Sequence, residues 1–481
     1  MFVKNNKKIV FVNPPLDIDK RYGKLGRAGG SEAPISLCYL SSVSRAEGFI
    51  AKIIDAQACR LDLKRTVEQI KIFDPGYVGI TASTMAIDSA SELARVLKIS
   101  IPGTKIIIGG CHVTALPEDT LKNCRDFDVG VIGEGEDTLK ELLRAFNGGR
   151  QLKSICGIIG KDDAGTYLTS PRSRIKDLDN LPFPDFDLLG DISKRYRLPA
   201  QSLMGQNSFS LVTSRGCFGK CSFCDKNVFG SHITMHSADY IVDMVEFLNK
   251  KYRITNVMFE DDNFMISKKR LFAFGELIRR KKLNIAWTCL ARIDSVDEEV
   301  LKIAKDAGCW QVSYGIESGS QRILDFYKKD INLDKIKNVI TLTKKLGLKS
   351  KGFFMWGNPG EDRHSIMETL RFIKNLSLDD ISITFATPYP GSEIWPDIDS
   401  YGSLDRSFEK MSCFNLVFVP NNLDAKFLFD SRKQALKEFY FRPRIILSYL
   451  SRLKSLSQMK DLIFSAFYLF FYVFRKEKID E

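Results

Sequence analysis

The feature that most constrains the fold is a repeated alternation of short apolar runs with segments of helical periodicity. In the first 146 residues this alternation predicts strands at 9–12, 51–54, 77–81, 105–108 and 128–132, with helices at 35–47, 64–73, 86–99 and 137–146. Apolar runs of this kind are typical of parallel strands that are buried on both faces. They predict an α/β fold with a doubly wound, flavodoxin-like or Rossmann sheet, whose ligand crevice lies at the carboxyl ends of the strands.

A second series of the same kind begins near residue 208. It predicts strands at 209–213, 256–259, 286–289, 311–315, 350–355 and 380–386, with helices at 237–250, 268–281, 297–307, 320–326, 333–346 and 363–374. Six such units predict a partial (β/α)6 TIM-like barrel with its chemistry at the C-terminal strand ends. We therefore expect an N-terminal binding domain (1–150), a connector (151–204) containing two prolines at 182 and 184, a barrel (205–400) and an α-helical C-terminal region (401–481).

Charge and cysteine content narrow the possible environments of the chain. The net charge is +12, and residues 431–481 hold eleven Lys and Arg against five Asp and Glu, which points to an anionic partner surface. Eleven cysteines in 481 residues are too few for a disulfide scaffold. The polar start, Met1 to Lys8, does not read as a signal peptide. We expect a cytoplasmic protein with reduced thiols.

The C-terminal tail holds the longest apolar run, Leu462 to Phe474, with seven aromatic residues in thirteen. As a helix it would be about 20 Å long, too short for a hydrocarbon core of about 30 Å. Lys460 and three basic residues at 475, 476 and 478 flank it. Aromatic rings and cations favour the surface of an anionic membrane. The alternative is a final helix that packs on the barrel or at a subunit contact.

Three cysteines form a compact motif directly after the first barrel strand. Cys217, Cys221 and Cys224 have the spacing Cys-x3-Cys-x-aromatic-Cys. A zinc site usually needs four protein ligands; no partner pair exists elsewhere, and His232 has an unusual spacing for a fourth ligand. Three ligands without a fourth favour a 4Fe-4S cluster with one open iron, over zinc or buried thiols. The other cysteines are read as small core residues: Cys38, Cys59, Cys111, Cys124, Cys156, Cys289, Cys309 and Cys413.

With this motif the chain resembles the radical S-adenosylmethionine (SAM) enzymes. The matching segments lie within 205–395, at 258–264, 287–294, 308–320, 352–361 and 387–392. The resemblance implies that the open iron binds the amino and carboxylate groups of SAM, and that SAM cleavage yields a 5′-deoxyadenosyl radical.

The N-terminal half resembles the cobalamin-binding domain that is joined to some radical SAM barrels, as in the anaerobic Mg-protoporphyrin cyclase and hopanoid methylases. The matching segments are 13–15, 109–114, 117–118 and 133–136. The usual Asp-x-His-x-x-Gly motif is absent, so cobalamin is expected to bind without a His ligand from that motif. Expected cobalamin contacts, with ordinary turns and a capping histidine as the alternative, are Pro14, Ser83, Gly109, Gly110, His112, Gly133 and Glu134.

The same resemblance suggests residues that contact SAM. Phe223 precedes the last cysteine of the motif and is expected near the adenine. Glu260 and Asp261, followed by Asp262, end the second barrel strand, where a carboxylate suits the SAM ammonium group. The further candidates are Arg292 for the SAM carboxylate, and Ser313 and Glu317 for the ribose. The alternatives are loop packing for Phe223, a solvated turn for the acidic residues and a structural ion pair for Arg292.

The function that follows is a cobalamin-dependent radical SAM methyltransferase acting on an unactivated carbon. The enzyme alternatives are a radical SAM cyclase or rearrangement enzyme, and a tRNA methylthiotransferase, whose second set of three cysteines is not matched by the widely spread Cys38, Cys59 and Cys111. A non-catalytic cobalamin or iron–sulfur sensor is the alternative from another class. Expected partners are a small-molecule or lipid-like substrate, a reducing donor such as flavodoxin or ferredoxin, and a membrane surface touched by the tail, but no nucleic acid.

Overall fold

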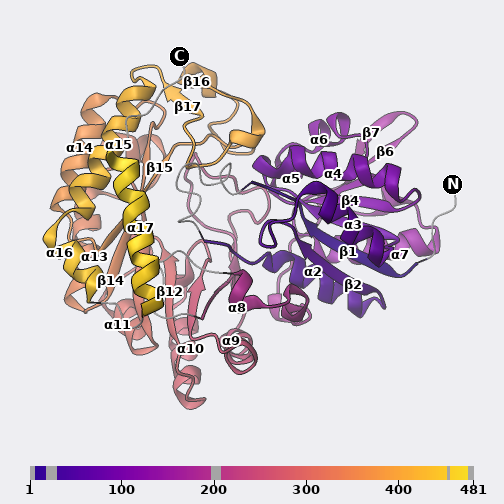
Figure 1. The fold of residues 1–481 in the computed structure, drawn as a ribbon, viewed down its shortest axis with the longest axis horizontal. Helices are drawn as coiled ribbons and strands as arrows, with labels where there is room; N and C mark the ends of the chain where they lie inside the picture. Colours follow the sequence, from indigo (N-terminus) through magenta and orange to yellow (C-terminus); the bar gives the residue numbers. More distant parts are fainter. Residues whose placement is uncertain (1–5, 18–29, 197–206, 452–455, 475–481) are drawn as a thin grey trace.

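The computed structural model describes residues 6–17, 30–196, 207–451 and 456–474. Two parallel sheets organise the chain (Figure 1): one lies in the indigo and purple N-terminal half, and the other lies in the half coloured from magenta to yellow. This arrangement confirms the predicted combination of a doubly wound sheet with a partial barrel.

The N-terminal sheet has seven strands in the order β2-β1-β3-β4-β5-β6-β7. Its strands are β1 (Lys8–Asn13), β2 (Ile50–Asp55), β3 (Tyr77–Thr81), β4 (Lys105–Gly109), β5 (Val129–Val131), β6 (Ile158–Asp162) and β7 (Gly165–Leu168). The first five are parallel, and the order reverses between β1 and β3. This 2-1-3-4-5 order is the flavodoxin-like one, which places a ligand crevice at the carboxyl ends of the strands.

Helices cover both faces of this sheet. They are α2 (Ile35–Ala46), α3 (Leu63–Phe73), α4 (Ile87–Ser100), α5 (Cys111–Ala115), α6 (Pro117–Asn123) and α7 (Glu136–Gly148). Alternate residues of β1 enter two separate cores: Ile9 and Phe11 pack on the side of α2 and α7, whereas Val10 and Val12 pack on the side of α3 and α4. Burial on both faces explains why the strands are uniformly apolar.

Two strands within the predicted connector (151–204) extend the sheet. β6 pairs antiparallel with β5, and β7 pairs antiparallel with β6. Asp162 accepts a hydrogen bond from the Ala164 amide, and Gly165 has a φ of +124°, so the turn between the strands depends on local chemistry. The other elements of the described part of the segment, up to residue 196, are short. They are η3 (Leu152–Ser154), η4 (Leu178–Asn180), η5 (Phe186–Leu189) and α8 (Ile192–Arg195).

The second sheet is a curled, open barrel of six parallel strands in the order β15-β14-β13-β12-β11-β8. The strands are β8 (Ser208–Leu211), β11 (Asn256–Phe259), β12 (Ala286–Ala291), β13 (Cys309–Glu317), β14 (Lys349–Trp356) and β15 (Asp380–Phe385). The helices are α9 (Ala238–Tyr252), α10 (Lys268–Arg280), α11 (Glu298–Asp306), α12 (Gln321–Phe326), α13 (Leu333–Lys345) and α14 (Arg363–Asn375). Side chains of Ser237, Ser267, Asp297, Asn332 and Asp362 cap five of these helices.

The C-terminal region returns to both sheets. The hairpin β16 (Gly402–Leu404) and β17 (Phe418–Pro420) encloses η10 (Phe408–Lys410), which packs beside η2 (Thr84–Ala86) of the N-terminal half. The chain then forms α15 (Ala425–Tyr440), α16 (Pro443–Leu450) and α17 (Leu456–Phe474) on the outside of the barrel (Figure 1). Among the described helices, none combines the length and apolar character that crossing a membrane requires.

Candidate active site between the two sheets

A cysteine loop, residues 216–233, leaves the barrel at the carboxyl end of its first strand. It lies between two short antiparallel strands, β9 (Ser214–Arg215) and β10 (Thr234–Met235). Gly216 opens the loop with a φ of +90°, and a Cβ there would overlap the carbonyl oxygen of His232. The Cys217 amide donates to the Gly230 carbonyl, which closes the loop across its base. Backbone geometry therefore brings the three predicted cluster ligands together at one end of the barrel.

The three thiols interact electrostatically. The pKa of Cys224 is raised to about 12, first because surrounding protein disfavours the thiolate and then because of the charges of Asp262, Cys221 and Cys217. In the described part of the chain, no group of three or more Cys, His, Asp or Glu side chains is arranged as it would be around one metal ion. A four-iron cluster separates its ligand sulfurs further than one ion does, and its positive irons would stabilise three adjacent thiolates. The donor set therefore fits a 4Fe-4S cluster.

Arg292 lies beside the cysteine loop. Its Nη1 is 3.6 Å from the Cys221 Sγ, while Nε and Nη2 form a bidentate ion pair with Asp294 at 2.9 and 2.7 Å. The guanidinium also lies over the Phe218 ring, 4.9 Å from its centre. The structural ion pair that we considered for Arg292 is thus formed, and the whole group lies at the cluster loop. Its contact with the SAM carboxylate stays a prediction.

Glu317 ends β13 in an unusual backbone conformation. Its φ is +69°, in the left-handed region that a non-glycine residue rarely adopts. The carboxylate is buried and pairs with the buried Lys329 Nζ at 2.8 Å. The ammonium group of Lys329 also lies 5.7 Å from the centre of the Phe223 ring, and Phe223 packs edge-on against Tyr327. Phe223 and Glu317 therefore belong to one site, joined by Lys329, which the sequence analysis missed.

Asp261 is fully buried and its carboxylate is occupied by the protein. It accepts hydrogen bonds from the Thr213 amide at 2.5 Å, the Thr213 hydroxyl at 2.7 Å and the Ser214 hydroxyl at 2.6 Å, and the Arg270 guanidinium lies 3.4 Å away. These donors fasten β8 and β9 to the end of β11. Asp261 therefore holds the strand that leads into the cysteine loop, and Glu260 follows β11 directly with its carboxyl group partly buried. Ser313 is buried within β13, on the strand that ends in Glu317.

The corresponding edge of the N-terminal sheet holds the predicted cobalamin contacts. Gly109 and Gly110 follow β4, and a Cβ on Gly109 would enter open space, whereas one on Gly110 would overlap the Ala82 carbonyl. Gly110 is thus required by packing, and Gly109 leaves room for a ligand. Gly133 follows β5 with a φ of +75°, and its amide donates to the Thr114 hydroxyl. The other two predicted contacts end neighbouring strands, with Pro14 buried after β1 and Ser83 exposed after β3.

His112 is the predicted contact whose surroundings best fit a bound ligand. It is 2% exposed, and its Nδ1 atom is buried without a hydrogen-bond partner. The ring packs edge-on against Phe408, with centres 4.9 Å apart. Burial lowers the pKa of His112 to about 4, so the ring is neutral at physiological pH. A neutral, buried nitrogen without a protein partner at the carboxyl edge of the sheet is consistent with a ligand there.

The two sheet edges face each other. The Val228 carbonyl of the cysteine loop lies 3.9 Å from where a Gly133 Cβ would be. Desolvation raises the pKa of Cys111, and the charge of Asp225 in the cysteine loop raises it further. Arg215, two residues before Cys217, reaches across to Glu134 at 2.7 Å and Glu136 at 2.5 Å. Glu134 also accepts a hydrogen bond from the Ile175 amide, so its carboxylate is engaged by the protein at the junction of the two halves.

A second buried link joins the halves on the same side. The Tyr39 hydroxyl lies 2.9 Å from Nε2 of His236, and Nδ1 of His236 lies 2.9 Å from Asp179. The sequence analysis did not identify Arg215, His236 or Tyr39. The one available signal was the position of Arg215 next to the cysteine motif, because a residue there must lie at the edge of the barrel.

Comparison with known proteins agrees with this geometry. Residues 211–373 match the radical SAM superfamily, and residues 24–143 match the B12 binding domain. The chain is 35% identical over 445 residues to an uncharacterised methyltransferase of Pyrococcus horikoshii, covering 92% of this chain and 94% of the relative. It is 27% identical to the anaerobic magnesium-protoporphyrin IX monomethyl ester cyclase of Rubrivivax gelatinosus, covering 85% and 74% of the two chains.

Two solved structures share the fold over almost the whole chain. The radical SAM methyltransferase TsrM of Kitasatospora setae, solved with cobalamin and a 4Fe-4S cluster bound, aligns with a TM-score of 0.70 over 91% of this chain and 90% of its own, at 17% identity. The cobalamin-dependent radical enzyme OxsB, solved with aqua-cobalamin and SAM, aligns with a TM-score of 0.75 over 97% and 72% of the chains, also at 17% identity. Together with the motif-bearing loop and the extended sequence match, these findings show that the chain belongs to the cobalamin-dependent radical SAM enzymes, whose cofactors are a 4Fe-4S cluster, SAM and cobalamin.

Proposed function

We propose that the protein is a methyltransferase that adds a methyl group to an unactivated carbon of a small or lipid-like molecule. The proposal rests on one observation: the carboxyl-end edges of the two sheets face each other. The cysteine loop of the barrel lies against the Gly133 loop of the N-terminal sheet. When bound, the cluster and SAM supply an adenosyl radical and cobalamin supplies a methyl group. A substrate between the two edges would be within reach of both.

The residues of this chain have separate tasks in the proposal. Cys217, Cys221 and Cys224 hold the cluster, and Arg292, which is paired with Asp294, donates a hydrogen bond toward the Cys221 sulfur. Glu260 directly follows β11 at the carboxyl ends of the barrel strands, and we assign its carboxylate to the SAM ammonium group. Asp261 holds the strand that leads into the cysteine loop.

Glu317, which Lys329 orients at the end of β13, would bind the ribose of SAM. At the other edge, Gly109 leaves space for the corrin ring and the Nδ1 of His112 provides a buried polar contact.

Two relatives support methyl transfer. Besides the Pyrococcus horikoshii methyltransferase, the chain is 27% identical to the cytidylyl-2-hydroxyethylphosphonate methyltransferase of Streptomyces wedmorensis, covering 84% of each chain. Cyclisation is the second candidate, because the Rubrivivax gelatinosus relative is a cyclase. The reducing electron would come from a flavodoxin- or ferredoxin-type donor, and the C-terminal tail would bring the enzyme to a membrane surface.

The decisive experiment is an anaerobic assay of reconstituted, cobalamin-loaded enzyme with SAM labelled with deuterium in its methyl group. A product carrying the labelled methyl supports methyl transfer, and a product that loses hydrogens without gaining a methyl supports cyclisation. Replacing Cys217, Cys221 and Cys224 together by Ala should abolish the iron chromophore and SAM cleavage. The matched control is Cys289→Ala, because Cys289 is buried in the barrel core on β12 and is not part of the cysteine loop. Reductive SAM cleavage by the triple variant would contradict the cluster assignment.

A further inference from the structure

The last two helices expose an apolar face where a water-facing helix would be polar. On α16, Leu447 and Leu450 are 64% and 52% exposed; on α17, Ile463, Phe467, Phe470 and Phe471 are between 49% and 61% exposed. Positions 463, 467, 470 and 471 follow the helical period, so they form one stripe along α17. We call these six residues the α16–α17 face. A contiguous exposed apolar patch marks an interaction site.

The opposite side of α17 is the packed side. Tyr472 and Val473 are 9% exposed, and α15 is the helix against which α17 packs most extensively. Phe441, at the end of α15 and the start of the turn into α16, has its ring 6.5 Å from that of Phe470. One side of α17 therefore packs on the protein, as in the alternative of a final helix packed on the barrel, and the other side does not. The other side continues from α17 through Phe441 to α16 as one surface.

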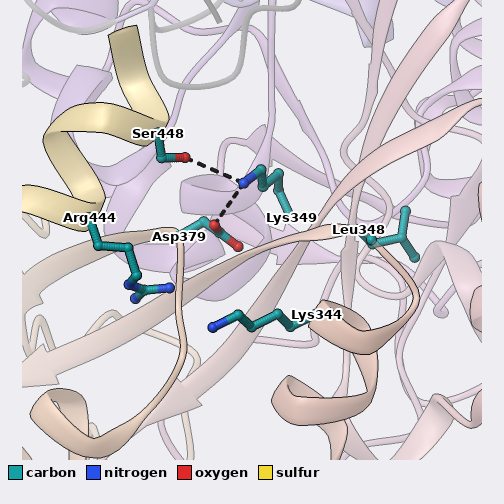
Figure 2. A pocket seen from close by; sticks show the side chains of 7 residues that line it. Lys344, Leu348, Lys349, Asp379, Arg444 and Ser448 are labelled. Carbon is teal, nitrogen blue, oxygen red and sulfur yellow. Dashed lines mark hydrogen bonds and ion pairs between the residues drawn. The ribbon is translucent and has the colours of Figure 1, made fainter. Parts of the chain in front are cut away.

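A basic pocket lies next to this face. It has a volume of about 220 Å³ and is lined by Lys344, Lys349, Asp379, Arg444 and Ser448, among others. Lys349 Nζ contacts Asp379 at 3.0 Å and the Ser448 hydroxyl at 3.3 Å. Figure 2 shows the cationic ends of Lys344 and Arg444 directed into the same space below Asp379. Three cations against one carboxylate leave the pocket with a net positive charge.

The pocket and the apolar face share α16. Arg444 and Ser448, one turn apart, line the pocket, and Leu447 lies on the adjoining exposed side of the same helix. α16 contains no acidic residue. An apolar surface with cations along its border matches the interface of an anionic bilayer, where apolar side chains enter the acyl boundary and cations meet phosphates. A second copy of the chain fits less well, because a symmetric contact would bring like charges together.

The pocket is remote from the candidate active site. Lys349 begins β14 and Asp379 directly precedes β15, so the pocket lies at the amino ends of the barrel strands. The cysteine loop lies at their carboxyl ends. The eight residues of β14 place these ends about 23 Å apart along the strand. A group held in the pocket is therefore not at the reacting centre, and its role is attachment.

We propose that the α16–α17 face docks the enzyme on an anionic lipid bilayer and that the basic pocket receives the phosphate of a lipid headgroup with a net negative charge. The inference rests on the proposed membrane association of the enzyme and not on the reaction that it catalyses. α17 lies in the plane of the interface with Phe467 and Phe471 toward the lipid, since the helix does not cross the membrane.

The test is sedimentation of the full-length holoenzyme with vesicles at low ionic strength. We expect binding to phosphatidylcholine vesicles that contain phosphatidylglycerol, and at least about fivefold weaker binding to phosphatidylcholine alone. Phe467→Glu with Phe471→Glu should abolish binding to both. Lys344→Glu should weaken binding to the anionic vesicles by at least about fivefold and leave the residual binding to neutral ones unchanged.

Lys269→Glu with Phe272→Glu is the matched control, because it replaces one exposed cation and one exposed aromatic residue on α10 by carboxylates. This variant should bind as the parent does, and iron content and SAM cleavage should be equal in every variant. If the parent does not bind vesicles, membrane association itself is wrong. If the parent binds and the Phe467/Phe471 variant binds equally, only the assigned face is wrong. A parent that fails to bind vesicles and forms a dimer that this variant dissociates would make the face a contact between copies.

Discussion

At the scale of single residues, the buried state of His112 has a measurable effect on stability. Its pKa is lowered to about 4 in the folded chain, whereas an unfolded histidine titrates near 6.5. Between these values the unfolded chain binds more protons, so this contribution to stability is complete above about pH 6.5 and declines as the pH falls toward 4. Between pH 7 and pH 5, we expect the free energy of unfolding of the parent to fall by about 2 kcal/mol more than that of His112→Gln.

Urea unfolding of the cobalamin-free protein at the two pH values measures this difference. His364→Gln is the control, because it makes the same substitution at an exposed histidine on α14, away from the buried crevice edge. An identical loss of stability in the parent and in His112→Gln would contradict the buried, neutral state.

The candidate site could be predicted only in part at this scale. The spacing of the three loop cysteines predicts that they share one centre. Phe223 was predicted from its position within that motif, and Glu317 from its position at the end of a strand. Lys329 could not be found, because nothing in its sequence neighbourhood indicates that its amine meets Glu317 across a loop. Asp261 and Glu260 look equivalent in sequence, and only the hydrogen-bond donors around Asp261 show that its carboxylate holds β8 and β9 against the end of β11.

At the scale of elements, the cysteine loop depends on the backbone at Gly216. A Gly216→Ala variant must place a Cβ against the His232 carbonyl at a φ of +90°, so we expect the loop to open and the iron content after reconstitution to fall severalfold. Gly48→Ala is the control, since Gly48 has a φ of +80° with no atom within 4 Å of its Cβ.

The Gly48→Ala control carries the same backbone strain, costing about 1–2 kcal/mol, without the steric overlap. Iron and sulfide analysis together with the visible spectrum measures the outcome. Full iron content in Gly216→Ala would show that the loop tolerates a different path.

Most elements were predictable because burial on two faces gives a parallel strand a continuous apolar run. β1, β3 and β4 are of this kind. β7 was not predictable, since its residues are mostly exposed and their pattern has no apolar stripe. Its pairing with β6 comes from a turn at Asp162 and Gly165, and such a turn is a weak signal beside the two prolines that follow it at 182 and 184.

At the scale of the whole molecule, the buried ion pairs of Arg215 couple the two halves. Removing one partner of a buried pair leaves an uncompensated charge, so Arg215→Met should cost about 3–5 kcal/mol and separate the unfolding of the two sheets. Arg95→Met is the control, because its pair with Glu92 is exposed on α4 and its loss should leave the stability nearly unchanged. Hydrogen exchange of each half, measured as the temperature rises, distinguishes the two variants. If Arg215→Met unfolds in a single transition at the same temperature as the parent, the ion pairs do not couple the two halves.

The contact between His112 and Phe408 joins residues that are synthesised at very different times, so the crevice of the N-terminal sheet is completed late during translation. The N-terminal sheet is synthesised first, but Phe408 leaves the ribosome about 300 residues after His112, which corresponds to roughly 15–60 s at usual elongation rates. During that interval one face of the imidazole has no cover. The nascent chain therefore passes through a state in which the crevice of the first sheet is open, and a large corrinoid could enter before the C-terminal hairpin closes over it.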